Sequence, residues 1–503
     1  MSNKKKLSFP SAFTVLFIVL VFAAILTYIV PAGSYSKLQY EGENKVFVIT
    51  NADGSTEELP GTQATLDKLK VKINVAKFED GSVYKPIAIP GTYKQVESQP
   101  QGFYQLIKAP IQGVYDTIDI IMFVFVLGGC IGVINSTGAF DAGIASLSRA
   151  TKGREFLLIV VVTVLITIGG TTFGMAEETI ALYPILIPIF LASGYDAIVC
   201  IAAIYMGSSI GTMFSTVNPF SSVMASNAAG IAFTEGLTIR LVGLVLATII
   251  TIIYIMKYAD KIKKDPTKSI IYHQKDEIEA RFLNNYDVSS APEFNIRRKL
   301  MLSLFAGTFV VMVWGVSTQG WWFMEMTSLF LVVGILLGVI SGMPEKEFVH
   351  KFIAGSADLV GVALTIGVAR GINGIMDAGV ISDTILYMSS GVVNGMNSGV
   401  FTVVMMFIFT VLGFFIPSSS GLAVLSMPIM APLADTVGVS RDVIVSAYQY
   451  GQGLMAFITP TGLILATLAM VDVTYDRWLK FIMPLMGITG AFAIVMLLIQ
   501  SFL

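Results

Sequence analysis

The chain has 503 residues, of which 54% are hydrophobic and 13% are charged, and its mean hydropathy is +0.76. Soluble domains carry about 25% charged residues, so a water-soluble enzyme of this size is excluded because its surface could not be solvated. With 32 basic against 34 acidic residues, the chain lacks the positive field that nucleic-acid binding needs, and the class that remains is a polytopic membrane protein.

The first apolar run covers 12–32 and follows a basic start at Lys4, Lys5 and Lys6. A run of about 20 apolar residues crosses a bilayer, so 1–32 is predicted to be a retained first transmembrane span with its lysines inside. No small-residue cleavage site comes directly after it, which argues against a removed signal peptide.

Residues 33–100 are polar and carry mixed charge, which predicts an extracytoplasmic insertion. Within this segment, 45–50 and 55–58 flank the turn-forming residues 51–54, and this pattern predicts a β-hairpin. The simplest interpretation is that the insertion caps the molecule without a role in transport.

The remaining apolar runs fall into repeat 1 at 101–257 and a second half at 299–503, separated by the basic segment 258–298, a predicted cytoplasmic linker. In each half, two runs are too short to cross the bilayer separately. They predict one re-entrant hairpin at 155–192 and another at 399–433.

Each hairpin precedes an apolar run that a proline interrupts, which predicts a broken transmembrane helix. The first is 196–231, interrupted at Pro219, and the second is 442–471, interrupted at Pro460. Lys and Arg gather at the predicted inner loops, so the topology has about nine crossings with the N-terminus inside and the C-terminus outside.

The two halves also match each other in sequence. Four pairs of segments occur in the same order: 134–144 with 372–380, 183–188 with 427–432, Gly194 and Gly207 with Gly438 and Gly451, and 216–219 with 458–461. The basic linker fixes the two copies in opposite orientations. The sequence therefore predicts an all-α polytopic membrane protein with two inverted repeats, which is an architecture of secondary transporters.

Broken helices free backbone N–H and C=O groups that a cavity, a ligand or an ion must satisfy, and their N-termini favour carboxylates. We therefore expect substrate to bind where the hairpin tips and the breaks meet. The predicted substrate-binding residues are Thr171, Thr172, Glu177, Glu178, Ser215, Asn218, Ser418, Ser419, Ser420, Tyr448, Gln452, Thr459 and Thr461. Freed carbonyls favour cations, so a Na⁺ site near Thr216, Asn218 and Thr459 is an alternative use of the breaks.

Glu177 and Glu178 distinguish the two hairpins, because the second tip carries only hydroxyls and glycine. A carboxylate in the membrane is costly and is a functional candidate by default. One of the two is expected to face the cavity and to bind a substrate ammonium or guanidinium or to carry a proton. The alternative is that both only favour the N-terminus of the following helix through its dipole.

Arg370 is the other charged outlier, inside the apolar run 357–376. It is either a partner of a substrate carboxylate or a structural partner of Asp141 or Asp377, and its distance from the breaks favours the structural role. The sequence has no P-loop, nucleophile triad or metal motif, so it indicates neither an enzyme, nor an ATP-driven pump, nor a cofactor.

Residues 169–179, 208–211 and 215–220 resemble the YfcC family, which is related to C4-dicarboxylate anaerobic carriers and belongs to a broad ion-transporter superfamily. The resemblance covers nearly the whole chain apart from 40–90. It implies an elevator-type carrier in the bacterial cytoplasmic membrane, working as a homodimer with a fixed scaffold and a mobile transport domain that contains both hairpins. Members are often labelled basic amino acid antiporters, and dicarboxylate labels also occur.

The residues favour one of these substrates. The serines of the second hairpin suit a carboxylate, the glutamates of the first hairpin suit a cationic group, and a dicarboxylate would be repelled there unless a proton or Na⁺ intervened. The first hypothesis is therefore an arginine/ornithine antiporter, and the alternative is a Na⁺- or H⁺-coupled transporter of C4-dicarboxylates or other carboxylates. Its expected partners are a small-molecule substrate and the lipid bilayer.

Overall fold

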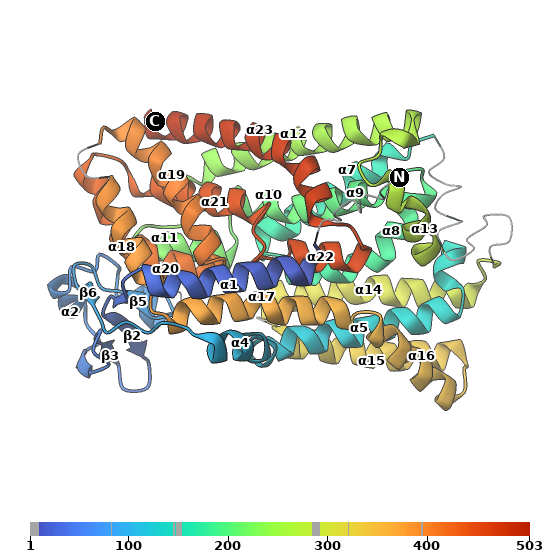
Figure 1. Cartoon of the computed structure of the whole chain (residues 1–503), viewed down its shortest axis with the longest axis horizontal. Helices are drawn as coiled ribbons and strands as arrows, with labels where there is room; N and C mark the ends of the chain where they lie inside the picture. The colour runs from blue at the N-terminus through green and yellow to red at the C-terminus, as the bar shows by residue number, and fades with distance from the viewer. Residues whose placement is uncertain are drawn as a thin grey trace, which may run out of the picture.

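The protein is described from a computed structural model, and the structure describes residues 10–81, 83–143, 146, 153–283, 292–319, 321–393 and 396–502. Lys4, Lys5 and Lys6, which support the predicted orientation, lie outside these residues. The helices run side by side along the long axis of the molecule in two layers, and a small unit of strands covers one end (Figure 1).

The first layer packs tightly because small residues line its helix crossings. A Cβ added to Gly113 would lie 2.0 Å from the carbonyl oxygen of Gly367, and one added to Gly128 would lie 2.5 Å from that of Gly355. The layer contains α1 (Ala12–Ile29), α4 (Phe103–Asp116), α5 (Ile118–Ser136), α14 (Ile296–Gln319), α15 (Phe323–Ser341), α16 (Glu345–Ala357) and α17 (Val360–Ala378).

Part of this layer packs around an apolar cluster. Phe123 of α5, Phe305 of α14 and Phe330 of α15 are buried against one another, with ring centroids 5.6 Å apart for Phe123 and Phe330 and 6.1 Å apart for Phe305 and Phe330. The buried cluster around them also includes Ala181 of the first predicted hairpin, and Ile120, Val313 and Val316 pack against both this cluster and the large core.

The second layer holds both predicted hairpins and both predicted broken helices. Its first half contains α7 (Phe156–Thr172), η1 (Glu177–Leu182), α8 (Tyr183–Ala192), α9 (Ala197–Ile201), η2 (Ala202–Met206), α10 (Gly207–Met213), η3 (Pro219–Val223), α11 (Met224–Ala228) and α12 (Leu237–Lys264). Its second half contains α18 (Ser382–Val392), α19 (Ser398–Phe415), α20 (Ser419–Thr436), α21 (Arg441–Ala456), α22 (Ile464–Val471) and α23 (Tyr475–Phe502).

The segment after α12 is short and polar. It contains η4 (Pro266–Lys268), η5 (Tyr272–Gln274) and α13 (Lys275–Phe282). Helix α12 runs to Lys264, past the predicted start of the linker at 258, because Lys261, Lys263 and Lys264 in its last turn complement the negative end of the helix dipole.

Eight helices within the described residues are long and apolar enough to cross a membrane: α1, α5, α12, α14, α15, α17, α19 and α23. The chain is thus mostly helical and rich in candidate membrane spans. Helices α7, with 17 residues, and α19, with 18, are the predicted first arms of the two hairpins, and both lie at the short end of the range for a span.

The matched glycines of the two halves adopt matching conformations. Gly194 after α8 and Gly438 after α20 both have positive φ, 84° and 72°, which favours glycine because it has no Cβ. Gly207 faces the carbonyl of Thr163 on α7, and Gly451 faces the carbonyl of Met406 on α19. In both halves, a glycine thus seats the interrupted helix against the first arm of its own hairpin.

The strand unit contains the predicted hairpin. Strands β3 (Val46–Thr50) and β4 (Thr56–Pro60) pair antiparallel, with Thr50 opposite Thr56. The main sheet has the order β4-β3-β2-β5 with β2 (Lys37–Glu41) and β5 (Ile87–Ala88), and β1 (Gly33–Ser34) pairs with β6 (Lys94–Gln95). Two short helices, α2 (Gln63–Lys68) and α3 (Ala76–Glu79), complete the unit.

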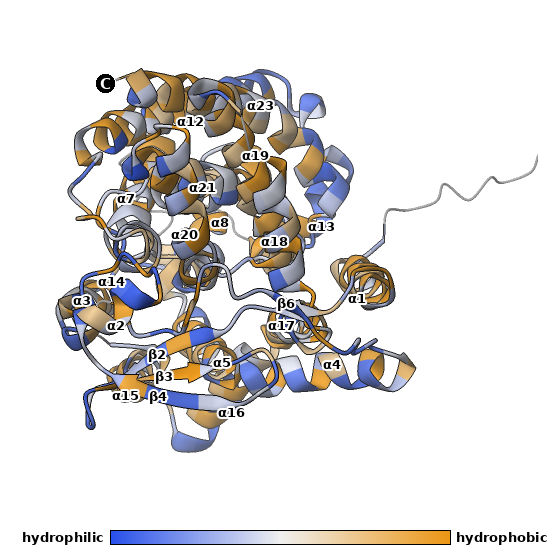
Figure 2. Cartoon of the chain, turned by 90° about the vertical axis from the view of Figure 1, so that its left-hand side faces the viewer, coloured by the Kyte–Doolittle hydropathy of each residue, from blue (hydrophilic) through white to orange (hydrophobic). Residues whose placement is uncertain are grey.

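The polarity of the strand unit differs from that of the helices. Figure 2 views the molecule from the end that the unit covers, and hydrophilic residues gather on β4 and on the turns of the unit, while β3 and helices such as α1 and α12 are mostly hydrophobic. The unit nevertheless has a core, because Phe47 and Phe78 are buried edge to face with ring centroids 5.1 Å apart.

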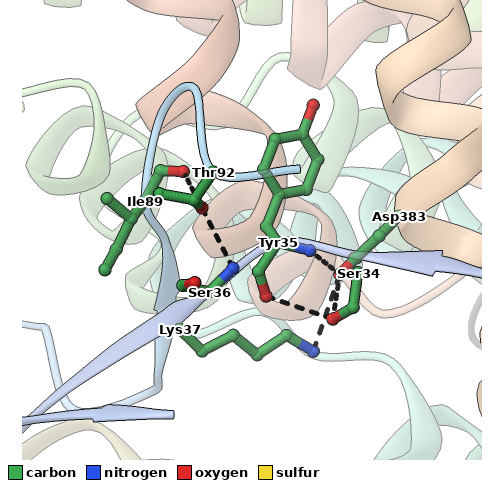
Figure 3. A network of polar contacts seen from close by, with 7 residues as sticks. All are labelled: Ser34, Tyr35, Ser36, Lys37, Ile89, Thr92 and Asp383. Atoms are coloured by element: carbon green, nitrogen blue, oxygen red, sulfur yellow. Dashed lines mark hydrogen bonds and ion pairs between the residues drawn. The ribbon is translucent and has the colours of Figure 1, made fainter. Parts of the chain in front are cut away.

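Asp383, in the first turn of α18, ties the strand unit to the second layer (Figure 3). Its buried carboxylate accepts hydrogen bonds from the Tyr35 backbone N–H at 3.1 Å and the Ser34 hydroxyl at 3.2 Å, and it lies 4.0 Å from Lys37 Nζ. Tyr93 adds a ring stack on Tyr387 of the same helix, with centroids 4.1 Å apart. The unit is therefore attached to α18 by directional contacts.

Asp383→Ala should loosen this attachment. The substitution leaves the buried N–H of Tyr35 without an acceptor, which costs about 1–3 kcal/mol. Amide hydrogen exchange across 33–41 is expected to accelerate, and the matched control Asp358→Ala, at an exposed aspartate on the end of α16, is expected to leave it unchanged. Equal exchange in both variants would contradict the anchoring role of Asp383.

Candidate functional site

The first hairpin tip is bonded to the break in the first interrupted helix. The Thr171 hydroxyl lies 3.0 Å from the Thr216 hydroxyl and accepts the Thr216 backbone N–H at 2.9 Å. Asn218 donates its amide to the Gly170 carbonyl at 2.9 Å and accepts the Phe220 backbone N–H at 2.9 Å. Asn218 is 1% exposed, and its side chain satisfies buried backbone groups on both sides of the break.

Ser215 extends this cluster toward the second half of the chain. Its hydroxyl lies 3.0 Å from that of Ser221, and its carbonyl accepts the Ser222 hydroxyl at 2.9 Å. Gln449 of α21 donates to the Ser222 hydroxyl at 2.6 Å and to the Ser215 hydroxyl at 3.3 Å. A side chain from the second half of the chain therefore supplies hydrogen bonds at the break in the first interrupted helix.

The second hairpin tip is bonded to α21 in the same manner. Tyr448 donates its hydroxyl to the Ser419 carbonyl at 2.6 Å, and Gln452 donates to the Pro417 carbonyl at 3.1 Å. Thr459 and Thr461 share a hydrogen bond of 2.7 Å, and Thr461 lies 3.4 Å from the Phe414 carbonyl at the end of α19. The break after α21 thus reaches the second tip.

The two clusters share one helix. Tyr448 and Gln452 lie four residues apart on one face of α21 and hold the second tip, whereas Gln449 is rotated by about 100° and holds the first break. Gly453 permits the close approach of α10, because a Cβ there would lie 2.9 Å from the Cα atom of Met213. Helix α21 therefore links the two breaks.

The predicted site residues do not all take part in these clusters. Thr172 is exposed and donates to the Ile168 carbonyl of its own helix at 2.6 Å. Ser418 is exposed and caps α20, accepting the Gly421 N–H at 3.2 Å, whereas Ser420 is buried. Thr459 bonds with Thr461, and among the described residues no hydrogen bond joins it to Thr216 or Asn218.

The two glutamates of the first tip differ in their contacts. Glu178 is 8% exposed, and its carboxylate accepts the Ala176 backbone N–H at 3.0 Å, so it closes its own turn. Glu177 is partly exposed, and no hydrogen bond or ion pair joins it to another described residue. Glu177 is therefore the glutamate available to a ligand.

A lysine from the strand unit reaches the second tip. Lys85, just before β5, donates to the Ser420 hydroxyl at 2.7 Å, and β5 packs against α20. Burial, with the nearby positive charge of Arg370 adding to it, lowers the pKa of Lys85. Among the residues that the structure describes, neither Lys85 nor Arg370 forms an ion pair with a carboxylate.

Within the described residues, Arg370 is not within ion-pair distance of Asp141 or Asp377, the two structural partners predicted for it. It acts electrostatically on Asp377, whereas the cation near Asp141 is Arg298. Its side chain is exposed, unlike its neighbours on α17, which are mostly buried. Lys85 thus brings a cation to the second tip, and Arg370 lies close enough to Lys85 to act on it electrostatically.

No sequence motif indicates three polar residues, Lys85, Ser222 and Arg240, that form hydrogen bonds at a tip, a break or a turn. Lys85 lies in the segment that was interpreted as a cap, and no sequence signal joins it to Ser420. Ser222 and Arg240 lie in apolar runs where polar side chains could have drawn attention. Arg240 is fully buried and donates to the Glu235 carbonyl at 3.0 Å, so it stabilises the turn before α12.

Interrupted helices, tips tied to breaks and many apolar spans define the class of a membrane transporter. The model of the C4-dicarboxylate anaerobic carrier family matches residues 9–502. The chain is 50% identical over 498 residues to an uncharacterised protein of Haemophilus influenzae, covering 99% of this chain and 98% of the relative. It is 31% identical to the Escherichia coli protein provisionally named as the basic amino acid antiporter YfcC, covering 96% and 94%.

The chain therefore belongs to the C4-dicarboxylate anaerobic carrier family and is a membrane transporter related to YfcC. Among solved structures, it is similar to MtrF of Neisseria gonorrhoeae, described as one of a class of antimetabolite efflux pumps, with 15% identity, a TM-score of 0.39 and coverage of 98% and 96%. The YdaH transporter of Alcanivorax borkumensis gives 14% identity, a TM-score of 0.39 and coverage of 97% and 98%.

Asn218→Ala should destabilise the first break. It removes the donor to the Gly170 carbonyl and the acceptor for the Phe220 N–H, so a loss of about 1–3 kcal/mol is expected. The measurement is thermal unfolding in detergent. The matched control is Asn397→Ala, since Asn397 caps α19 but joins no second segment, and its loss should be near 1 kcal/mol or less. If both variants unfold at the same temperature, the bridging role of Asn218 is wrong.

Proposed function

We propose that this chain is a secondary active transporter that exchanges basic amino acids, such as arginine and ornithine, across the bacterial cytoplasmic membrane. One observation carries the proposal: the two hairpin tips differ in charge. The first tip carries Glu177 and Glu178, and the second meets Lys85, which lies near Arg370. The provisional name of the YfcC relative supports the same substrate class.

The charge difference suits a molecule with an anionic and a cationic end. The substrate carboxylate would lie at the second tip, where Lys85 supplies a positive charge and the first turn of α20 offers backbone N–H groups. The ammonium or guanidinium of the substrate would lie at Glu177, which no described side chain neutralises. The serine hydroxyls of the first break bond to Gln449 of α21, which is next to Tyr448, the residue that holds the second tip.

A second candidate is Na⁺- or H⁺-coupled transport of a C4-dicarboxylate or another carboxylate, which the name of the family supports. Lys85 and Arg370 would hold one carboxylate equally well. The other carboxylate would meet Glu177, so a proton or a cation would have to travel with it. The requirement for a coupling ion separates this candidate from the first.

The mechanism we propose is an elevator motion of the second layer against the first, in a homodimer of inverted repeats with its N-terminus inside and its C-terminus outside. The arrangement of the helices in two layers supports a division into two bodies. Both tips and both breaks lie in the second layer, so the substrate would move together with that layer.

The test is exchange by the purified carrier in liposomes loaded with ornithine, with labelled arginine outside, with and without a Na⁺ gradient. Counterflow without a Na⁺ gradient is expected. No counterflow with any cationic amino acid would overturn the first candidate, and Na⁺-dependent uptake of labelled succinate would establish the second.

Glu177→Gln should reduce arginine exchange more than Glu178→Gln. Loss of a charged hydrogen bond to the substrate costs about 1.5–3 kcal/mol, which corresponds to a roughly 10- to 100-fold rise in KM. Glu178→Gln keeps an oxygen acceptor for the Ala176 N–H and should change KM less. Normal exchange by both variants would leave the glutamates with a helix-dipole role alone.

Lys85→Ala should weaken binding of the substrate carboxylate at the second tip. A roughly 10-fold or larger rise in KM is expected, since a charge-assisted contact is lost. Lys68→Ala removes an exposed lysine of the same strand unit and serves as the control. If the two variants transport alike, Lys85 takes no part in transport and the strand unit is a cap.

A further inference from the structure

A basic cavity lies away from the two tips, between the C-terminal end of α12, the N-terminal end of α23 and the segment that holds η4 and η5. Its volume is about 410 Å³. The residues that line it are Tyr254, Tyr258, Lys261, Thr267, Lys268, Ser269, Ile270, His273, Arg477, Lys480 and Phe481. The lining contains four Lys or Arg side chains and a histidine but no Asp or Glu.

Nearby carboxylates neutralise only part of this charge. Lys268 lies 3.4 Å from Asp265, and Arg477 lies 3.4 Å from Asp476. Within the described ranges, the side chains of Lys261 and Lys480 take part in no ion pair or hydrogen bond. The cavity therefore offers two uncompensated ammonium groups from two different helices.

The hydroxyl groups of the cavity are already engaged. Tyr258 and Ser269 both donate to Asp196, at 2.7 Å each, and Tyr254 donates to the Phe481 carbonyl at 2.5 Å. A ligand would be held mainly by positive charge and not by a fixed pattern of hydrogen bonds. Such a site accepts any compact anion of sufficient charge, and phosphate fits this description.

The cavity lies where two apolar helix surfaces end. Helices α12 and α23 pack side by side (Figure 1), and both expose aliphatic side chains along the stretches that lead away from the cavity. On α12 these include Val245, Ile249 and Ile253, and on α23 they include Ile488 and Val495, all at least 45% exposed. Acyl chains can cover such surfaces while a headgroup occupies the basic end.

We propose that this cavity binds a phosphate group, supplied by the headgroup of an anionic phospholipid whose acyl chains lie along α12 and α23. The bound phosphate would lie between Lys261 and Lys480, compensate one of their two positive charges, and join the end of the first half of the chain to the last helix of the second. The site is separate from both hairpin tips, so the proposal does not depend on the identity of the transported substrate.

The experiment compares the full-length carrier, K261A/K480A and a control of equal charge change, K257A/K264A. Lys257 and Lys264 are exposed on the same helix but do not line the cavity. Each protein is purified in detergent and titrated with phosphatidylglycerol, with phosphatidylcholine and with inorganic phosphate. Bound lipid is counted by native mass spectrometry, and the unfolding temperature is followed in parallel.

Two lysines at a lipid phosphate correspond to an affinity difference of about 30-fold, so K261A/K480A should retain phosphatidylglycerol roughly 30-fold more weakly than the parent and the control. Phosphatidylcholine should bind weakly to all three proteins. A difference between the variants with inorganic phosphate but not with phosphatidylglycerol would keep the phosphate site and make its source soluble. Equal affinities of K261A/K480A and K257A/K264A for both ligands would overturn the proposal.

Discussion

The need to satisfy backbone groups at interrupted helices governs this structure. In a hydrocarbon environment, a free C=O or N–H group costs several kcal/mol, so helix breaks persist only where side chains replace the lost partners. Here Asn218 bonds the Gly170 carbonyl, Gln452 the Pro417 carbonyl and Tyr448 the Ser419 carbonyl. Each of these bonds also joins a hairpin tip to an interrupted helix, so the same contacts that permit the breaks assemble the candidate site.

These bonds depend on the close approach of helices. Gly211 lets α10 reach the Thr167 carbonyl of α7, where a Cβ would lie 2.4 Å away, and Gly451 lets α21 reach α19. Side chains as short as threonine and asparagine can bridge two segments only at such distances. The glycines and the polar residues at the breaks therefore act together. Gly207 and Gly451, at matching positions, give both halves the same close approach of helices.

The strand unit changes the interpretation of the charge distribution. A polar insertion of mixed charge is ordinarily a solvated surface, yet Lys85 leaves that surface and reaches Ser420, while Asp383 holds the unit on α18. The residues of the second tip itself offer only hydroxyl and backbone groups. The cation at this tip, Lys85, comes from a segment more than 300 residues away in the chain. The proposed binding of a substrate carboxylate at the second tip therefore depends on the contact between the strand unit and α20.

The sequence by itself determined the class of protein and the positions of its helices. Apolar runs set the spans because hydropathy and length act locally: the run 12–32 contains α1, and the run 357–376 lies within three residues of α17 at each end. The strands β3 and β4 followed from local turn residues, and the residues at the breaks followed from proline and glycine. Glu177 and Glu178 were found because charge is conspicuous in an apolar setting.

Only the tertiary structure decided which of these residues meet. It separated Glu177, without a partner, from Glu178, which closes its own turn, and it turned Thr172 away from the break. It also brought Gln449 to Ser222 and Lys85 to Ser420, contacts between segments 227 and 335 residues apart. Such pairings depend on how whole helices and the strand unit pack, and no local pattern of residues encodes that packing.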